Sequence, residues 1–114
     1  MNTRDAAHAA GVTYRQVDHW LRCGLGTDPR SGQGSVRTFT ADDVRVIRFL
    51  GDLSRIAANN RHVGATWIDV ACRVAAQITG DPRILDRSLV FVAIDGTISD
   101  QPAYGWVVEP GETP

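Results

Sequence analysis

A stretch of helix length, GVTYRQVDHWLRCG, lies between two glycines near the start of the chain and covers residues 11–24. At helical spacing, four polar residues fall on the side away from the apolar positions: Thr13, Arg15, Gln16 and His19. Arginine can form two hydrogen bonds with guanine, glutamine can form two with adenine, and threonine can donate to phosphate or base. These residue types predict a face that reads base edges in double-stranded DNA, with an ordinary solvated helix face as the alternative.

The elements that position this face can be predicted from the same segment. Thr13 and Gln16 have the spacing of a capping box, so we expect a helix that begins at Thr13 and stops at Gly24. A shorter helix, capped by Thr3, should end at Gly11, and the inward side of the second helix should carry Val17, Trp20 and Leu21. Two helices joined by so short a turn have the sequence form of a helix-turn-helix.

Turn residues follow, and then two more helices. Residues 24–38 are rich in glycine, and Leu25 could pair with Val36–Phe39 as a hairpin wing around a loop at residues 28–35. Thr40 with Asp43 predicts a capped third helix that ends near residues 59–60. Thr66 with Asp69 predicts a capped fourth helix that ends at residues 80–82, and the short connection favours an antiparallel pair.

Beyond Pro82 the helical period gives way to strands. Leu89–Ile94 is a continuous apolar run, Asp95-Gly96 is a tight-turn sequence, and Ala103–Val108 is a second candidate strand. The expected fold is mainly α with small β elements: a winged helix-turn-helix, a helical pair and a C-terminal β-hairpin. We divide it into a DNA-binding domain at residues 1–62 and a part for support, dimerisation or partner docking at residues 63–114.

Size, charge and cysteine content limit the classes of protein to consider. A chain of 114 residues suits one small domain, and a large enzyme is not expected. Residues 1–62 hold nine Arg against six Asp, whereas residues 63–114 hold three Arg against seven acidic residues. Without an apolar run of membrane length or a leader, we expect a cytoplasmic protein. Its two cysteines, Cys23 and Cys72, are expected to be reduced thiols.

The order and spacing of several elements in residues 6–53 resemble the winged helix-turn-helix of the mercury-resistance-regulator (MerR) family. The matching elements are Ala7, Gly11-Val12-Thr13, Trp20, Gly24-Leu25, Val36-Arg37-Thr38-Phe39-Thr40 and Asp42-Asp43. The stretch GVTYRQ and the wing sequence Gly32-Gln-Gly-Ser35 are similar to an actinobacterial or phage-like subgroup. The resemblance implies a DNA-binding transcription regulator. From the residues we expect no enzymatic activity, cofactor or metal.

The resemblance also implies roles for individual residues. Arg15, Gln16 and His19 would approach the major groove, while Thr13 and Tyr14 would lie by the backbone, where the helix dipole favours phosphate. The wing would add Arg30, Ser35 and Arg37 to the DNA-binding set, with the two arginines on adjacent phosphates.

Two departures from the family pattern bear on how this chain would work. Asp18 stands where many members have arginine, so a phosphate clamp is not expected there. Family members dimerise through a long C-terminal coiled coil, whereas residues 80–114 contain no sustained heptads. A homodimer would therefore use another surface of the C-terminal half, such as an exposed strand at Leu89–Ile94 or the stripe of the fourth helix.

Four other interpretations fit parts of the sequence. An excisionase-type recombination directionality factor also uses a small winged helix, and an interaction or inhibitor module would dock a host protein through the acidic half. Val92-Ala-Ile-Asp95-Gly-Thr97 is similar to the phosphotransfer loop of the haloacid-dehalogenase fold, but Ala93 stands in the place of the nucleophile. His19 and Cys23 are spaced as two metal ligands, yet no further ligands accompany them.

Overall fold

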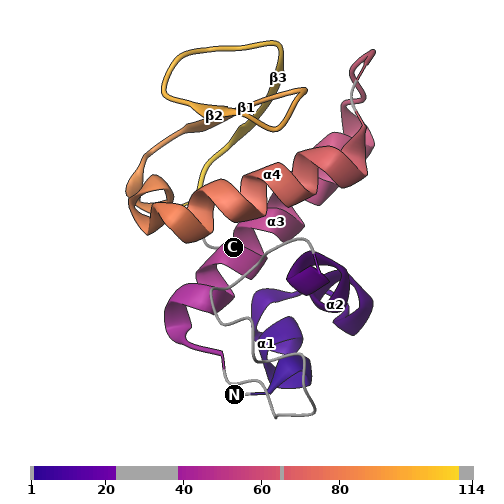
Figure 1. The fold of residues 1–114 in the computed structure, drawn as a ribbon, viewed down its shortest axis with the longest axis vertical. Coiled ribbons are helices and arrows are strands. Elements are labelled where there is room, and N and C mark those ends of the chain that lie inside the picture. The colour runs from indigo at the N-terminus through magenta and orange to yellow at the C-terminus, as the bar shows by residue number, and fades with distance from the viewer. Residues whose placement is uncertain (1, 23–38, 65, 111–114) are drawn as a thin grey trace.

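The computed structural model describes residues 2–22, 39–64 and 66–110 (Figure 1). Within these residues the elements are, in chain order, α1 (Thr3–Ala10), α2 (Tyr14–Arg22), α3 (Ala41–Asn59), α4 (Trp67–Gly80), the 3-10 helix η2 (Pro82–Asp86), β1 (Val90–Ala93), β2 (Ile98–Ser99) and β3 (Gly105–Val108). Helices α1 and α2 lie on one side of α4 in Figure 1, and the sheet lies on the other. The predicted mainly α fold with a C-terminal β-hairpin is confirmed.

The turn between α1 and α2 follows from one glycine. Gly11 has φ 75° and ψ 29°, the left-handed conformation that glycine adopts at low cost. The amide of Val12 then donates to the carbonyl of Ala7 at 3.0 Å, which closes the helix end. The predicted end of the first helix is confirmed, but its N-cap is Asn2, whose Oδ1 accepts from the amide of Asp5 at 2.8 Å. Asn2 and Thr3 are both good cap residues, and Asn2 takes the cap position with an extended backbone, φ -84° and ψ 178°.

Helix α3 begins at the predicted capping box. The amide of Thr40 donates to Asp43 Oδ2 at 2.9 Å, and the amide of Asp43 donates to Thr40 Oγ1 at 3.2 Å. The helix ends at Asn59, as expected from the sequence. Its buried residues form one side of the core: Val46, Ile47, Phe49, Leu50, Gly51 and Leu53.

The predicted bounds of the fourth helix are close to those of α4, but the capping prediction is wrong. Thr66 is the N-cap residue and its side chain makes no capping hydrogen bond. Its ψ is 105°, whereas the capping Thr40 has ψ 172°, so the chain enters the two helices differently. The apolar stripe is buried as expected, at Val70, Ala71, Val74, Ala75 and Ile78. Helix α4 crosses in front of α3 in Figure 1 and packs against it.

The sheet is antiparallel, with strand order β2-β1-β3. Asp95-Gly96 forms the predicted tight turn: the amide of Gly96 donates to the carbonyl of Ala93 at 2.8 Å, and Gly96 has φ 89°. The turn leads into the short strand β2, which was not predicted. Strand β3 pairs with the other side of β1, with Val92 opposite Trp106. Because β1 is bonded on both sides, the expected exposed strand at Leu89–Ile94 is wrong, and the edges of the sheet are β2 and β3.

Buried side chains of both halves form a single core cluster that runs from α1 to β3. No helix in the described ranges is long and apolar enough to cross a membrane. Cys72 on α4 is disulfide-bonded, so the expectation of reduced thiols is wrong for this residue. The reason is that separation along the chain says little about proximity in the fold.

Candidate nucleic-acid interface

The first turn of α2 is built by a reciprocal pair of hydrogen bonds. The amide of Thr13 donates to Gln16 Oε1 at 3.0 Å, and the amide of Gln16 donates to Thr13 Oγ1 at 3.1 Å. The Thr13 hydroxyl also lies 3.3 Å from Gln16 Oε1. The predicted capping box is therefore present, and it occupies the carbonyl end of the Gln16 side chain. Nε2 of Gln16 makes no hydrogen bond within the described residues.

The capping box also decides which backbone groups stay open at this helix end. Four amides at a helix N-terminus have no partner within the helix. Here the box satisfies those of Thr13 and Gln16, which leaves the amides of Tyr14 and Arg15 at the positive end of the helix dipole. Two open amides at a helix start can bind an anionic oxygen such as that of a phosphate.

The outward side chains of α2 divide into paired and unpaired groups. Arg15 is exposed and makes no ion pair or hydrogen bond within the described part of the chain. His19, one turn further on, is also exposed. Arg22 pairs with Asp18 at 3.1 Å, four residues apart on the same face. Asp18 therefore offsets the charge of Arg22, while Arg15 keeps its five donors for another partner.

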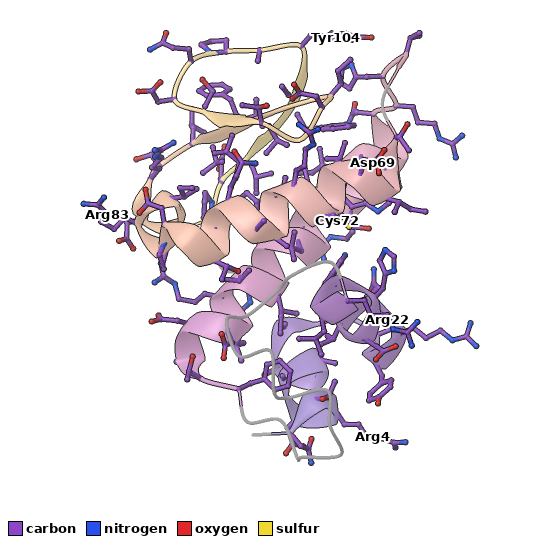
Figure 2. All side chains as sticks on the ribbon, viewed as in Figure 1. Arg4, Arg22, Asp69, Cys72, Arg83 and Tyr104 are labelled. Atoms are coloured by element: carbon purple, nitrogen blue, oxygen red, sulfur yellow. The ribbon has the colours of Figure 1, made fainter. Side chains whose placement is uncertain are left out.

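Arg4 belongs to the same surface and was missed from the sequence. Its guanidinium carbon lies 5.7 Å from the centre of the Tyr14 ring, in a cation–π contact between α1 and α2. Tyr14 is half exposed, and Figure 2 shows Arg4 and Arg22 extending from the same side of the two helices. No sequence signal marks Arg4, because its partner is set by the angle between two helices. The contact places a further positive charge beside the open N-terminus of α2.

The buried side of α2 and a hydrogen bond from α3 support this surface on its inner side. Val17 and Trp20 are buried and Leu21 is half-buried, as predicted for the inward side of α2. Arg48 on α3 donates from Nη2 to the carbonyl of Ala9 at 3.1 Å, near the end of α1. A rigid support of this kind fixes the orientation of the outward residues, which a base-reading helix needs.

Five of the eight predicted DNA-binding residues belong to α2 or directly precede it, and each is exposed or half-buried: Thr13, Tyr14, Arg15, Gln16 and His19. The other three, Arg30, Ser35 and Arg37, lie outside the described residues, together with the predicted hairpin wing up to residue 38. Phe39, at the end of that segment, is buried in the core. Among the residues with described positions, no group of three His, Cys, Asp or Glu side chains could hold a metal ion.

A family model described as "MerR HTH family regulatory protein" matches residues 1–57, which is half of the 114-residue chain. The matched segment contains α1, α2 and most of α3. No curated protein and no solved structure gives a significant match.

Proposed function

Because the chain belongs to the MerR family of helix-turn-helix regulatory proteins, we propose that it is a transcription regulator that binds specific sequences of double-stranded DNA. The observation that carries the proposal is the first turn of α2. It combines two open amides, the side chain of Arg15, which has no partner among the described residues, and the nearby charge of Arg4 on one exposed surface. Such a surface offers phosphate contacts for positioning and a base contact for sequence preference.

In this proposal each residue has a separate task. Arg15 makes the base contact in the major groove, with Gln16 Nε2 and His19 beside it. Thr13 fixes the helix end, and Tyr14 holds Arg4 next to the DNA backbone. By the family resemblance, Arg30, Ser35 and Arg37 of the wing contact adjacent phosphates or sugars.

Residues 63–114 support the DNA-binding part at residues 1–62, and we propose that they also form the homodimer contact. The free edge of β3 and the outer face of the sheet are the surfaces that favour this. Val107 on β3 is 45% exposed and lies opposite Phe91 in the strand register, so the outer face carries apolar side chains. A regulator of this type would work in the cytoplasm, where bacterial DNA is found.

The test is a selection of binding sequences from a random duplex library with the purified protein at two salt concentrations. Its mass in solution is recorded under the same conditions. We expect one enriched motif whose affinity falls steeply with salt, since phosphate contacts release counterions. A palindromic motif with a dimer mass supports the homodimer, and enrichment of tandem sites with strong DNA bending would instead favour an excisionase-type factor. No enrichment at either salt would contradict DNA reading and favour a protein partner for the acidic half.

A further inference from the structure

A cavity lies on the side of the molecule formed by the end of α3, the start of α4 and β3. It has a volume of about 390 Å³ and is lined by Ser54, Ala57, Ala58, Arg61, His62, Trp67 and Trp106. Figure 1 shows the last turns of α3 and the first turn of α4 close together at one end of the molecule. The volume is within the range of small-molecule sites in proteins. None of these residues belongs to the proposed DNA-binding set.

Aromatic rings form the walls. The rings of Trp67 and Trp106 have centroids 6.2 Å apart and meet edge to face at 87°, and the ring of His62 meets Trp106 at 5.3 Å and 79°. Trp106 is fixed in place because its Nε1 donates to the carbonyl of Asn60 at 2.7 Å. Trp67 is only half-buried, so part of its surface is left for another ring.

Small side chains leave the space open. Ser54, Ala57 and Ala58 occupy the part of α3 that faces the cavity, where larger residues would fill it. Ala57 and Ala58 follow Ser54 by three and four residues, so the three side chains lie on one face of the helix. A flat apolar group can therefore lie between this face of α3 and the tryptophan rings.

The charged side chain beside the cavity determines whether an apolar ligand that also carries a charge can bind there. Among the residues that the structure describes, Arg61 is the charged residue that lines the cavity, and no acidic side chain lines it. Within the described residues Arg61 makes no ion pair or hydrogen bond, so its guanidinium is open to a ligand. An organic cation could use aromatic walls but would be repelled by Arg61, whereas a carboxylate can accept two hydrogen bonds from it.

We propose that this cavity binds a planar aromatic carboxylate of one or two rings. The rings stack against Trp67 over the small face of α3, and the carboxylate pairs with Arg61. This inference goes beyond DNA binding and does not depend on it, because it concerns a different surface and a different class of ligand.

The test uses the full chain and three probes of the same shape: 2-naphthoate, its uncharged amide, and the cationic 2-naphthylmethylammonium. The three tryptophan indole N–H signals are followed by NMR during each titration. With 2-naphthoate we expect saturable shifts of the Trp67 and Trp106 signals, and no shift of the Trp20 signal, because Trp20 is buried on the inward side of α2. The amide should bind roughly tenfold more weakly, because it lacks the charge-assisted bonds to Arg61.

Two variants locate the site. Ala58→Leu fills the cavity and should abolish the shifts, while Ala76→Leu on the exposed side of α4 is the matched control and should leave them unchanged. Arg61→Gln should bind acid and amide equally, and Arg87→Gln, outside the cavity, should keep the preference. Equal affinity of the unmodified protein for acid and amide, unchanged binding by Ala58→Leu, or no saturable shift with 2-naphthoate would each overturn the proposal. The DNA selection described above has its own outcome, independent of these.

Discussion

Val12, in the turn between α1 and α2, lies directly against Gly51 in the middle of α3. A Cβ atom placed on Gly51 would stand 2.5 Å from Val12 Cγ1, closer than non-bonded carbon atoms approach in proteins. Glycine inside a helix costs stability relative to alanine, so its presence here is explained by this contact. The missing side chain of Gly51 leaves a notch in the surface of α3, and Val12 from the turn of the helix-turn-helix packs into it.

The Gly51→Ala variant should therefore be less stable than the unmodified protein. We expect a loss of about 1–3 kcal/mol from overpacking, larger than the gain of about 1 kcal/mol from better helix propensity. Gly80→Ala is the matched control, because a Cβ there meets no atom within 4 Å. Urea unfolding monitored by circular dichroism gives both values. Val12→Ala removes the methyl groups that the new Cβ would meet, so Gly51→Ala should lower the free energy of unfolding less in that variant than in the unmodified protein. An equal loss in both proteins would contradict the contact between Val12 and Gly51.

Two substitutions of Gln16 separate its structural role in the capping box of α2 from its proposed role in DNA contact. Gln16→Ala should lower the free energy of unfolding by about 0.5–1.5 kcal/mol, because the Thr13 amide loses its acceptor. Gln16→Glu keeps an acceptor at the same place and adds a favourable charge at the helix start, so its stability should be close to that of the unmodified protein. On DNA, Gln16→Glu should still bind at least about tenfold more weakly, because its carboxylate faces phosphates.

Unfolding and fluorescence anisotropy measurements on the same three proteins would check this separation. If Gln16→Glu bound DNA as tightly as the unmodified protein, α2 would not approach DNA with its first turn.

Asp95 gives a prediction for pH dependence. Its Oδ1 accepts from the amide of Thr97 at 2.9 Å, and this bond lowers the pKa of the carboxyl below its ordinary value of 3.8. A lowered folded-state pKa stabilises the fold above the ordinary pKa, and the stabilisation is lost as pH falls through the folded-state value. Asp95→Ala should therefore be less stable than the unmodified protein at about pH 6, with a difference that shrinks towards about pH 3.

The control for Asp95 is Asp100→Ala. Asp100 is exposed and accepts no side-chain hydrogen bond within the described residues, so its removal should have a small effect at both pH values. Thermal unfolding at the two pH values provides the comparison. If the stability lost in Asp95→Ala increased as pH fell, the effect assigned to the hydrogen bond between Asp95 and the Thr97 amide would be contradicted.

Local signals in the sequence predicted much of the helical part. The capping boxes at Thr13 and Thr40 join residues three apart, so both partners are visible in the sequence. The same spacing at Thr66 and Asp69 misled the prediction, because the chain enters α4 with a different ψ. A cap motif thus marks where a helix begins more reliably than it specifies the hydrogen bond made there.

Features that depend on tertiary packing were not predictable. Strand β2 is only Ile98–Ser99, too short to show alternation, and without it β1 was expected at an edge of the sheet. The contact of Arg4 with Tyr14 and the notch at Gly51 join separate helices. The candidate DNA-binding residues on α2 could be predicted because they recur at helical spacing within one segment. Arg4 lies on a different helix, so no spacing in the sequence connects it with them.

The most direct test of the account is a repeat of the binding-site selection with Arg15→Ala, beside Arg87→Ala as a control from the C-terminal half. Arg15 is exposed and unpaired in the described part of the chain, and we propose that it makes a base contact. Arg15→Ala should lose about 1–3 kcal/mol on the best site and relax the preference at one base pair of each half-site. Arg87→Ala should select the same motif as the unmodified protein. If Arg15→Ala also selected that motif unchanged, with equal weakening on every sequence, α2 would not read bases through Arg15 and the central claim would be wrong.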